Sequence, residues 1–284
     1  MENLVSIIIP VYNREDLVSK AIQSAIDQTY SNIEVIIVDN NSTDRSWDII
    51  EKYVKIDNRI KAFRNEINIG PVKNWLKGLH LSKGEYVKIL FSDDWIDTSF
   101  VEKTIKILEN NSDVGFVISK VEILQYSKSF INYKISNKSE KIVSDAYIDR
   151  YFKLKNNLAP VSPGCALFRR NDIVNSLIAE IPNPFNIEYS KHGAGPDLLL
   201  YLMNAKKYKY IYYIDECLSF FYGSKNSFTL NNNLILPYSY AKVFFLNESS
   251  NYHIKYRIIL LLKLIKNLHV NFRIVYYFLR KNNK

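Results

Sequence analysis

The chain has 284 residues, of which 47% are hydrophobic and 24% are charged. These proportions are typical of globular proteins, and the length allows one large hydrophobic core or one domain with an appendage. They exclude a disordered chain, a collagen-like chain and a small disulfide scaffold. Because the only two cysteines are Cys165 and Cys217, we expect a reducing, cytoplasmic compartment.

The net charge of +9 is concentrated at the C-terminus. Residues 255–284 contain eight basic residues and no acidic residue, while the other 254 residues contain 30 basic and 29 acidic residues. The main part of the chain is therefore nearly neutral, and its charge does not indicate nucleic-acid binding. The N-terminus lacks the basic region and cleavage site of a secretory signal, and no apolar run approaches the ~20 residues of a membrane-spanning helix.

Strand-like and helix-like segments alternate over the first hundred residues. Short β-branched runs predict strands at Leu4–Ile9, Ile33–Val38, Ile60–Arg64 and Glu85–Phe91. Helical spacing of apolar residues predicts helices at Glu15–Gln28, from Asp44 through Val54, and at Val72–Leu81. This alternation is typical of a mostly parallel, Rossmann-like sheet with helices on both faces, which binds ligands at the carboxyl ends of its strands.

The pattern is less regular after about residue 111. We expect strands at Val114–Leu124, Gly164–Arg169 and Tyr208–Asp215, helices at Ile142–Phe152 and Asp197–Ala205, and a loop at Asn226–Asn233. The predicted fold class is therefore α/β. We assign residues 1–230 to one domain and residues 231–284 to a helical, basic, amphipathic C-terminal extension.

Four aspartates stand where a predicted strand ends or a predicted helix begins. Asp39 follows the second strand, Asp93 and Asp94 follow the fourth, and Asp197 follows a glycine-containing run before a helix. Adjacent carboxylates in such a loop can bind Mg²⁺ or Mn²⁺ when substrate phosphates supply further ligands. Each aspartate by itself also has a structural explanation, as a turn residue or at a helix N-terminus.

Several familiar catalytic motifs are missing from the sequence. The first strand is not followed by G-x-G-x-x-G, and the P-loop pattern G-x-x-x-x-G-K-[ST] does not occur. The four histidines are scattered, so a zinc site and a histidine-based triad have little support. Carboxylates are the remaining candidates for the chemistry.

Six segments in this order resemble the motifs of the family 2 inverting glycosyltransferases, which have the GT-A fold. They are SIIIPVYN (Ser6–Asn13), VDNNSTD (Val38–Asp44), NIGPVKNWLKG (Asn68–Gly78), GEYVKILFSDDW (Gly84–Trp95), GCALFRR (Gly164–Arg170) and GPDLLL (Gly195–Leu200). The resemblance implies transfer of a sugar from a nucleotide-diphosphate donor, foremost a UDP-sugar. The acceptor would be a hydroxyl of a glycan or of a lipid-linked acceptor in bacterial cell-surface polysaccharide synthesis.

The resemblance also implies roles in donor binding. Pro10, Val11 and Tyr12 would hold the nucleotide base, with Tyr12 against its face. Asp39 would accept a hydrogen bond from the imide of a uracil or thymine, because these bases present an N–H there. Lys73 would supply positive charge near the nucleotide.

The remaining aspartates receive metal-binding and catalytic roles from the same resemblance. Asp93 would lie at the ribose or the metal, and Asp94 would be the main protein ligand of Mn²⁺ or Mg²⁺ at the diphosphate. Asp197 would be the general base that takes the proton of the attacking hydroxyl. A single inverting displacement needs one such base and no covalent nucleophile.

The sequence departs from the family pattern at several positions. They are Asn40 and Pro196, where acidic residues are common, Phe91-Ser92, where the first acidic residue of an Asp-x-Asp is missing, and Trp75, where many members have Arg. These departures bear on the identity of the donor more than on the class of reaction.

The tail at residues 255–284 has no Gly or Pro, and its basic residues other than Arg257 lie on one side of a helical wheel, opposite an apolar side. This pattern predicts one or two amphipathic helices that dock on an anionic membrane surface at the inner face of the cytoplasmic membrane. Alternatively, the apolar side packs on the globular domain or on a second subunit of a homo-oligomer. We expect no nucleic-acid partner.

Two other functions fit parts of the sequence. A nucleotidyltransferase would share the α/β layout, but we would expect a glycine-rich basic loop after its first strand, and PVYNRED contains no glycine. A non-catalytic scaffold that binds nucleotide-sugars would dock on membranes through the tail. The four aspartates argue against this scaffold.

Overall fold

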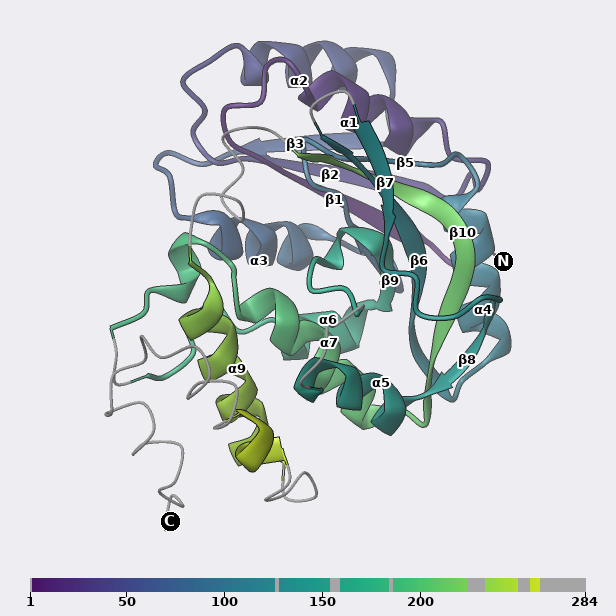
Figure 1. The fold of residues 1–284 in the computed structure, drawn as a ribbon. Coiled ribbons are helices and arrows are strands. Elements are labelled where there is room, and N and C mark those ends of the chain that lie inside the picture. The colour runs from purple at the N-terminus through teal and green to yellow at the C-terminus, as the bar shows by residue number, and fades with distance from the viewer. Residues whose placement is uncertain are drawn as a thin grey trace.

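The structure, a computed structural model, describes residues 2–125, 128–153, 159–183, 186–223, 233–249 and 256–260. Within these residues the chain forms one ten-stranded sheet (Figure 1). The strands are β1 (Val5–Val11), β2 (Ile33–Asp39), β3 (Ile60–Arg64), β4 (Tyr86–Ile89), β5 (Trp95–Ile96), β6 (Val114–Gln125), β7 (Lys128–Asn132), β8 (Glu140–Val143), β9 (Ala166–Arg169) and β10 (Tyr210–Gly223).

The sheet is mixed: four strand pairs are parallel, as the alternation of strands and helices predicted, and five are antiparallel. Its strand order is β3-β2-β1-β4-β9-β6-β10-β5, with β7 beside β6 and β8 beside β10. Strands β3, β2, β1 and β4 are parallel neighbours, and β6 and β10 form a further parallel pair. The inserted strand β9 runs antiparallel to both β4 and β6. Because Val11 pairs with Asp39, the carboxyl ends of β1 and β2 lie at the same edge of the sheet.

Helices cover both faces of the sheet (Figure 1). They are α1 (Val18–Ile26), α2 (Ser46–Ile56), α3 (Pro71–Leu81), α4 (Phe100–Asn110), α5 (Ser144–Phe152), α6 (Arg170–Ser176), α7 (Pro196–Lys207) and α9 (Ile235–Asn247).

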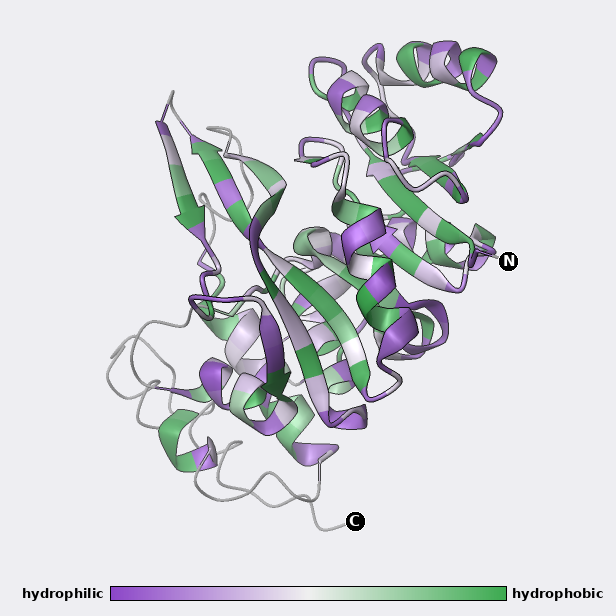
Figure 2. Ribbon diagram, turned by 90° about the vertical axis from the view of Figure 1, so that its right-hand side faces the viewer, coloured by the Kyte–Doolittle hydropathy of each residue, from purple (hydrophilic) through white to green (hydrophobic). Residues whose placement is uncertain are grey.

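Successive residues of β1 show how the two faces are filled. Ile7 and Ile9 belong to a core with residues of α1, α2 and α4, whereas Ile8 belongs to a core with residues of α3, α7 and α9. Successive side chains of a strand point to opposite faces of a sheet. A strand buried on both faces is therefore apolar along its length, which explains the hydrophobic colour of the central strands in Figure 2.

The predicted strands and helices of the first hundred residues are confirmed, with small differences at their ends. α2 begins at Ser46, and Asp44 precedes it as a turn residue whose carboxylate accepts hydrogen bonds from the Glu15 and Ser46 N–H groups. The sequence did not indicate β5, β7, β8 or α6, which are short elements. In the predicted loop Asn226–Asn233, only Asn233 lies within the described residues.

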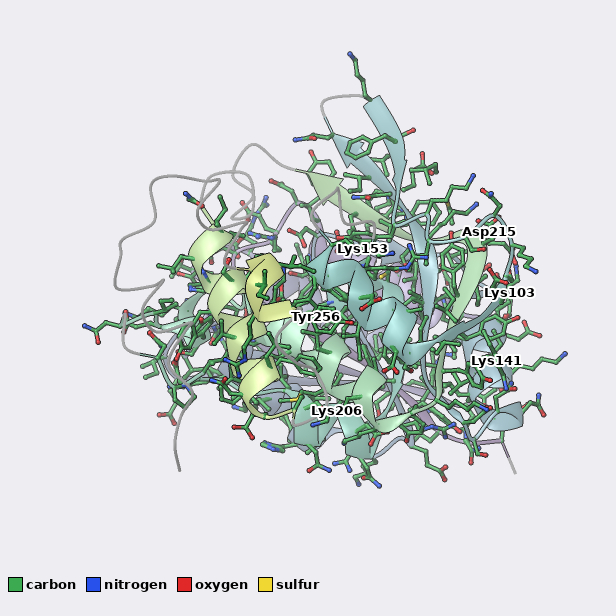
Figure 3. All side chains as sticks on the ribbon, turned by 60° about the horizontal axis from the view of Figure 1, so that its bottom comes forward. Lys103, Lys141, Lys153, Lys206, Asp215 and Tyr256 are labelled. Atoms are coloured by element: carbon green, nitrogen blue, oxygen red, sulfur yellow. The ribbon has the colours of Figure 1, made fainter. Side chains whose placement is uncertain are left out.

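The C-terminal segment adds α9, which packs against α7. Residues 256–260 are also helical, and there the Tyr256 ring, labelled in Figure 3, lies 4.7 Å from the Phe152 ring, while Leu260 is buried. The rest of the predicted amphipathic tail lies outside the described residues, so its docking on a membrane stays a prediction, as does the domain boundary at residue 230. In the part of the chain that the structure describes, no helix is both long and apolar enough to cross a membrane.

Candidate active site

A cavity of about 1240 Å³ opens at the carboxyl ends of β1, β2 and β4. Its walls also include the start of α3, residues of the β6–β7 hairpin and the segment that leads into α7. Seven of the eight residues predicted for the site line this cavity, namely Pro10, Val11, Tyr12, Lys73, Asp93, Asp94 and Asp197. The sheet topology therefore gathers residues that are up to 187 positions apart, from Pro10 to Asp197, around one space.

The end of β1 presents an aromatic ring to the cavity. Val11 is buried in the sheet, whereas Tyr12 is 44% exposed. Asn13 then turns the chain with φ of 51°, and its side chain accepts a hydrogen bond from the Thr43 N–H at 2.8 Å. The loops after β1 and β2 are thus tied together, and the Tyr12 ring is left free to stack on a planar ligand.

Asp39, the eighth predicted residue, is not among the described residues that line the cavity. Its carboxylate is fully buried and accepts hydrogen bonds from the Ser42 hydroxyl and from the Ser42 N–H at 3.0 Å. It also forms an ion pair with Arg64, whose Nε lies 3.2 Å from Oδ2. Contact with a nucleotide base requires these partners to move, and the role of Asp39 in reading the base stays a prediction.

Asn40 lines the cavity beside Asp39 and organises the neighbouring wall. Its amide nitrogen donates to Asn68 Oδ1 at 2.7 Å, and its amide oxygen accepts from Asn65 Nδ2 at 2.9 Å and from the Ile69 N–H at 3.0 Å. A carboxylate cannot donate a hydrogen bond in this way. Asn40, through a donor that a carboxylate lacks, therefore helps to hold the loop of residues 65–70.

The acidic pair lies in the loop after β4. Asp93 forms an ion pair with Arg14, with 3.4 Å between Oδ2 and Nε, and the Asp93 side chain is 29% exposed. Asp94 is buried, and its Oδ1 accepts a hydrogen bond from the Tyr222 N–H at 3.0 Å. Burial, together with the neighbouring charge of Asp93, raises the pKa of Asp94 well above its usual range.

This pair fits a hard divalent cation. Both side chains offer carboxylate oxygens to the cavity, which are the ligands that Mg²⁺ and Mn²⁺ prefer, and a cation would offset the repulsion between Asp93 and Asp94. Within the described residues, no group of three or more His, Cys, Asp or Glu side chains is placed to hold a metal. Phosphate oxygens of a ligand and water would have to complete the coordination.

Asp197 is the second residue of α7 and is held by three donors. Its Oδ1 accepts hydrogen bonds from the Gly195 N–H at 2.8 Å and the Leu198 N–H at 2.6 Å, and its Oδ2 accepts one from the Tyr238 hydroxyl at 2.8 Å. Burial nevertheless raises the pKa of Asp197 to about 7. A carboxylate with such a pKa can take up and release a proton near neutral pH, as a general base must.

The loop before Asp197 fits tightly against α3. Gly193 has φ of 75°, and a Cβ atom there would lie 2.5 Å from Cη2 of Trp75. The Trp75 ring also lies 5.3 Å from the Phe91 ring, between centroids. Trp75 therefore supports both the loop that carries Asp197 and the loop that carries the acidic pair.

Buried side chains hold one further wall of the cavity, at residues 160–164. The Tyr151 hydroxyl donates to the Pro160 carbonyl oxygen at 2.5 Å, and the Tyr201 hydroxyl donates to the Ser162 carbonyl oxygen at 2.8 Å. Lys88 on β4 donates from Nζ to a third carbonyl in the same segment, that of Gly164. Sequence reasoning missed this support, although a lysine inside the apolar strand Glu85–Phe91 was a signal that could have indicated it.

The sheet with helices on both faces, with an acidic pair after one strand and a carboxylate at a helix start in the same cavity, is the arrangement of a GT-A glycosyltransferase. The family profile described as "Glycosyl transferase family 2" matches residues 6–175, which is more than half of the chain. The chain therefore belongs to glycosyl transferase family 2.

Curated relatives match part of the chain. An uncharacterized glycosyltransferase of Haemophilus influenzae is 36% identical over 126 residues, which cover 44% of this chain and 39% of that protein. The UDP-Glc:alpha-D-GlcNAc-diphosphoundecaprenol beta-1,3-glucosyltransferase WfaP of Escherichia coli is 42% identical over 106 residues, covering 37% of this chain and 41% of WfaP. The chain thus spans less than half the length of these relatives.

A solved structure resembles nearly the whole chain. S. aureus TarS 1-349 in complex with UDP-GlcNAc superposes with a TM-score of 0.70 at 17% identity, covering 92% of this chain and 71% of that one. At this identity the likeness shows the fold alone. It confirms the predicted GT-A fold.

Proposed function

We propose that the protein transfers a sugar from a nucleotide-diphosphate donor, foremost a UDP-sugar, to a hydroxyl of a glycan or lipid-linked acceptor in cell-surface polysaccharide synthesis. The observation that carries the proposal is the presence, in one cavity, of the acidic pair Asp93-Asp94 and of Asp197 with a pKa near 7. Membership of family 2 supports glycosyl transfer. The names of two similar proteins, one using UDP-Glc and one bound to UDP-GlcNAc, support a UDP-sugar.

The reaction would be a single displacement with inversion at the anomeric carbon. The acceptor oxygen forms a bond to this carbon while the bond from the carbon to the diphosphate oxygen breaks, and the diphosphate leaves with the electron pair. Asp197 takes the proton of the acceptor hydroxyl. Because its pKa is about 7, a large fraction of Asp197 is ionised and ready for this step at neutral pH.

The donor would lie along the ends of β1, β2 and β4. Tyr12 stacks on the base, beside Pro10 and Val11, and Asp39 accepts the base imide N–H once its loop has rearranged. Lys73 at the start of α3 lines the cavity and is exposed, so its ammonium group can approach a phosphate.

Asp94 and Asp93 would hold Mn²⁺ or Mg²⁺ at the diphosphate. When bound, the cation supplies Lewis-acid stabilisation of the charge that grows on the leaving nucleoside diphosphate. Arg14, which pairs with Asp93 and lines the cavity, holds that carboxylate adjacent to the donor space.

The basic tail would place the enzyme on the cytoplasmic face of the membrane. Residues 255–284 carry eight basic and no acidic residues, which favours binding to anionic lipid headgroups. A lipid-linked acceptor would be presented at the same surface. Removing residues 261–284 should release the protein from anionic vesicles while leaving the described helical residues 256–260 in place.

The direct test is calorimetric titration of UDP into the protein, with and without Mn²⁺, repeated with GDP and dTDP. We expect UDP to bind more tightly with Mn²⁺ than without it and more tightly than GDP. Binding of none of the three nucleotides would contradict the proposal, because the cavity would then not be a donor site. Release of UDP from UDP-glucose or UDP-N-acetylglucosamine would then separate catalysis from binding alone.

A further inference from the structure

The C-terminal helix α9 reaches the candidate base from a distant part of the chain. The hydroxyl of Tyr238, in the first turn of α9, donates to Asp197 Oδ2 at 2.8 Å across 41 residues of sequence. Tyr238 lines the cavity, yet it lies outside the segment that matches the family and outside every motif of the sequence. Its contact with Asp197 is therefore a feature of this fold that the family match does not explain.

The loop that carries Asp197 packs closely against α9. The Tyr189 hydroxyl donates to the Pro237 carbonyl oxygen at 3.2 Å, next to Tyr238 in the chain. A Cβ atom on Gly195 would lie 2.6 Å from the Tyr189 ring and 3.4 Å from Cβ of Ala241 on α9. Only a residue without a side chain fits there, so the helix sits directly on the loop that carries Asp197.

The hydrogen bonds of Asp197 distinguish its two oxygens. Oδ1 accepts two backbone N–H groups, from Gly195 and Leu198, which use both of its acceptor sites. Oδ2 accepts only the Tyr238 hydroxyl among the described residues, so one of its acceptor sites is open for a proton. The oxygen that Tyr238 touches is therefore the one that would receive the acceptor's proton.

We propose that Tyr238 is a positioning residue for Asp197, which aims Oδ2 at the acceptor hydroxyl and favours the ionised form of the carboxylate. The inference rests on the proposed function of Asp197 as the general base. It makes α9 a part of the active site, because the geometry of the base depends on a helix that follows the family match.

Few titratable groups face Asp197 within the described residues. Tyr133, which follows β7, is electrostatically coupled to Asp197, and burial raises the pKa of both Tyr133 and Tyr238 above the usual range of tyrosine. Both hydroxyls therefore stay protonated near neutral pH. His192, on the loop before Asp197, accepts a hydrogen bond from the Ala194 N–H and has Glu180 as its charged neighbour.

The test compares the pH dependence of sugar transfer in Tyr238→Phe and in the unaltered enzyme. The variant loses one donor to a charged carboxylate, so we expect the acidic limb of kcat to move up by about one pH unit. Because Asp197 Oδ2 would no longer be held toward the acceptor hydroxyl, kcat at high pH should fall by about tenfold. The Kd of UDP should not change, because Tyr238 contacts the carboxylate of Asp197 and not the nucleotide.

Three further variants serve as controls: Tyr189→Phe, a fluorinated tyrosine at position 238, and Asp197→Asn. Tyr189→Phe removes a hydrogen bond to α9 but none to Asp197, so the acidic limb of kcat in this variant should stay where it is in wild type. A shift as large as that of Tyr238→Phe would overturn the role of the Tyr238 hydroxyl. A fluorinated tyrosine at position 238, which has the same shape but is a stronger donor, should move the limb to lower pH. This protein tests the inference even where Tyr238→Phe does not fold.

Asp197→Asn separates the inference from the proposed function. An inactive Asp197→Asn together with an unchanged kcat and limb in Tyr238→Phe overturns the positioning role alone. An active Asp197→Asn overturns the assignment of the base, and the inference with it.

Discussion

The side-chain amine of Lys88 donates a hydrogen bond to the backbone carbonyl of Gly164. Lys88 belongs to β4, the strand that leads to the acidic pair, and Gly164 follows Ser162 and Pro163, which line the cavity. The contact therefore ties the loop that would hold the metal to another wall of the same cavity. It is made by a fully buried basic group, which has a consequence for stability.

Lys88 should make stability depend on pH. Burial lowers the pKa of Lys88 to about 7, far below that of an exposed lysine. Between about pH 7 and 9 the unfolded chain binds a proton here that the folded chain has lost, so this group adds stability as pH rises, by up to about 1.4 kcal/mol per unit. Urea unfolding of wild type and Lys88→Met at several pH values measures the difference, and identical pH slopes would contradict it.

Asp94→Asn should have opposite effects on stability and on metal-assisted binding. Because folding raises the pKa of Asp94, the charged group costs stability once pH exceeds its unfolded pKa, and the amide should make the metal-free protein more stable at pH 7. The same change should weaken UDP binding in the presence of Mn²⁺ by at least about tenfold, since mutating even a residue that only hydrogen-bonds to a metal ligand lowers metal affinity by that factor.

Asp93→Asn serves as the matched comparison, because Asp93 is partly exposed and already paired with Arg14. Its effect on the stability of the metal-free protein should be small. Equal melting temperatures for metal-free wild type and Asp94→Asn would contradict the prediction that the buried charge of Asp94, beside Asp93, lowers stability. Unchanged Mn²⁺ dependence of UDP binding in Asp94→Asn would count against its role as a ligand.

Gly193→Ala should disturb both stability and catalysis. The left-handed backbone at φ 75° and the 2.5 Å approach to Trp75 both oppose a side chain, and we expect a loss of about 1–3 kcal/mol. The displaced loop carries Asp197, so kcat should fall as well. The double variant with Trp75→Phe should recover part of the stability by opening space, and thermal unfolding of the three proteins compares them. A single variant as stable as wild type would refute the tight fit.

Turnover should depend on pH near neutrality. Since burial raises the pKa of Asp197 to about 7, kcat should rise with pH through this value and then level off as the base becomes ionised. An exposed aspartate would give a limb near pH 4 instead. The profile is measured with a saturating donor and a fixed Mn²⁺ concentration, and a flat profile between about pH 5 and 8 would contradict the assignment.

The sequence predicted the parts of the fold and site that local patterns encode. The β1 and β2 strands are continuous apolar runs, and loops at their carboxyl ends had to meet at one edge once the sheet was parallel. This argument places the loops of Tyr12 and Asp94 at one edge, whereas Asp197 follows no strand and was assigned to the site by the family resemblance; all three line the cavity.

The parts that were missed depend on long-range contacts. Tyr238 is 41 residues from Asp197 and belongs to no motif, so only the packing of α9 brings them together. β5 has two residues, too few to show a periodicity, and exists because β10 pairs with it. Nor could local patterns show that Asp39, at the end of β2, turns toward Arg64 and Ser42 behind the cavity wall.

The most direct test of the central claim is a comparison of transfer and donor binding in Asp197→Asn. The amide keeps the size of the side chain but cannot accept the proton, so UDP-sugar turnover should fall by about a hundredfold or more. The Kd of UDP with Mn²⁺ should stay close to that of wild type, because the acidic pair is unchanged. A loss of UDP affinity as large as the loss of turnover, or a turnover close to that of wild type, would contradict Asp197 as the general base.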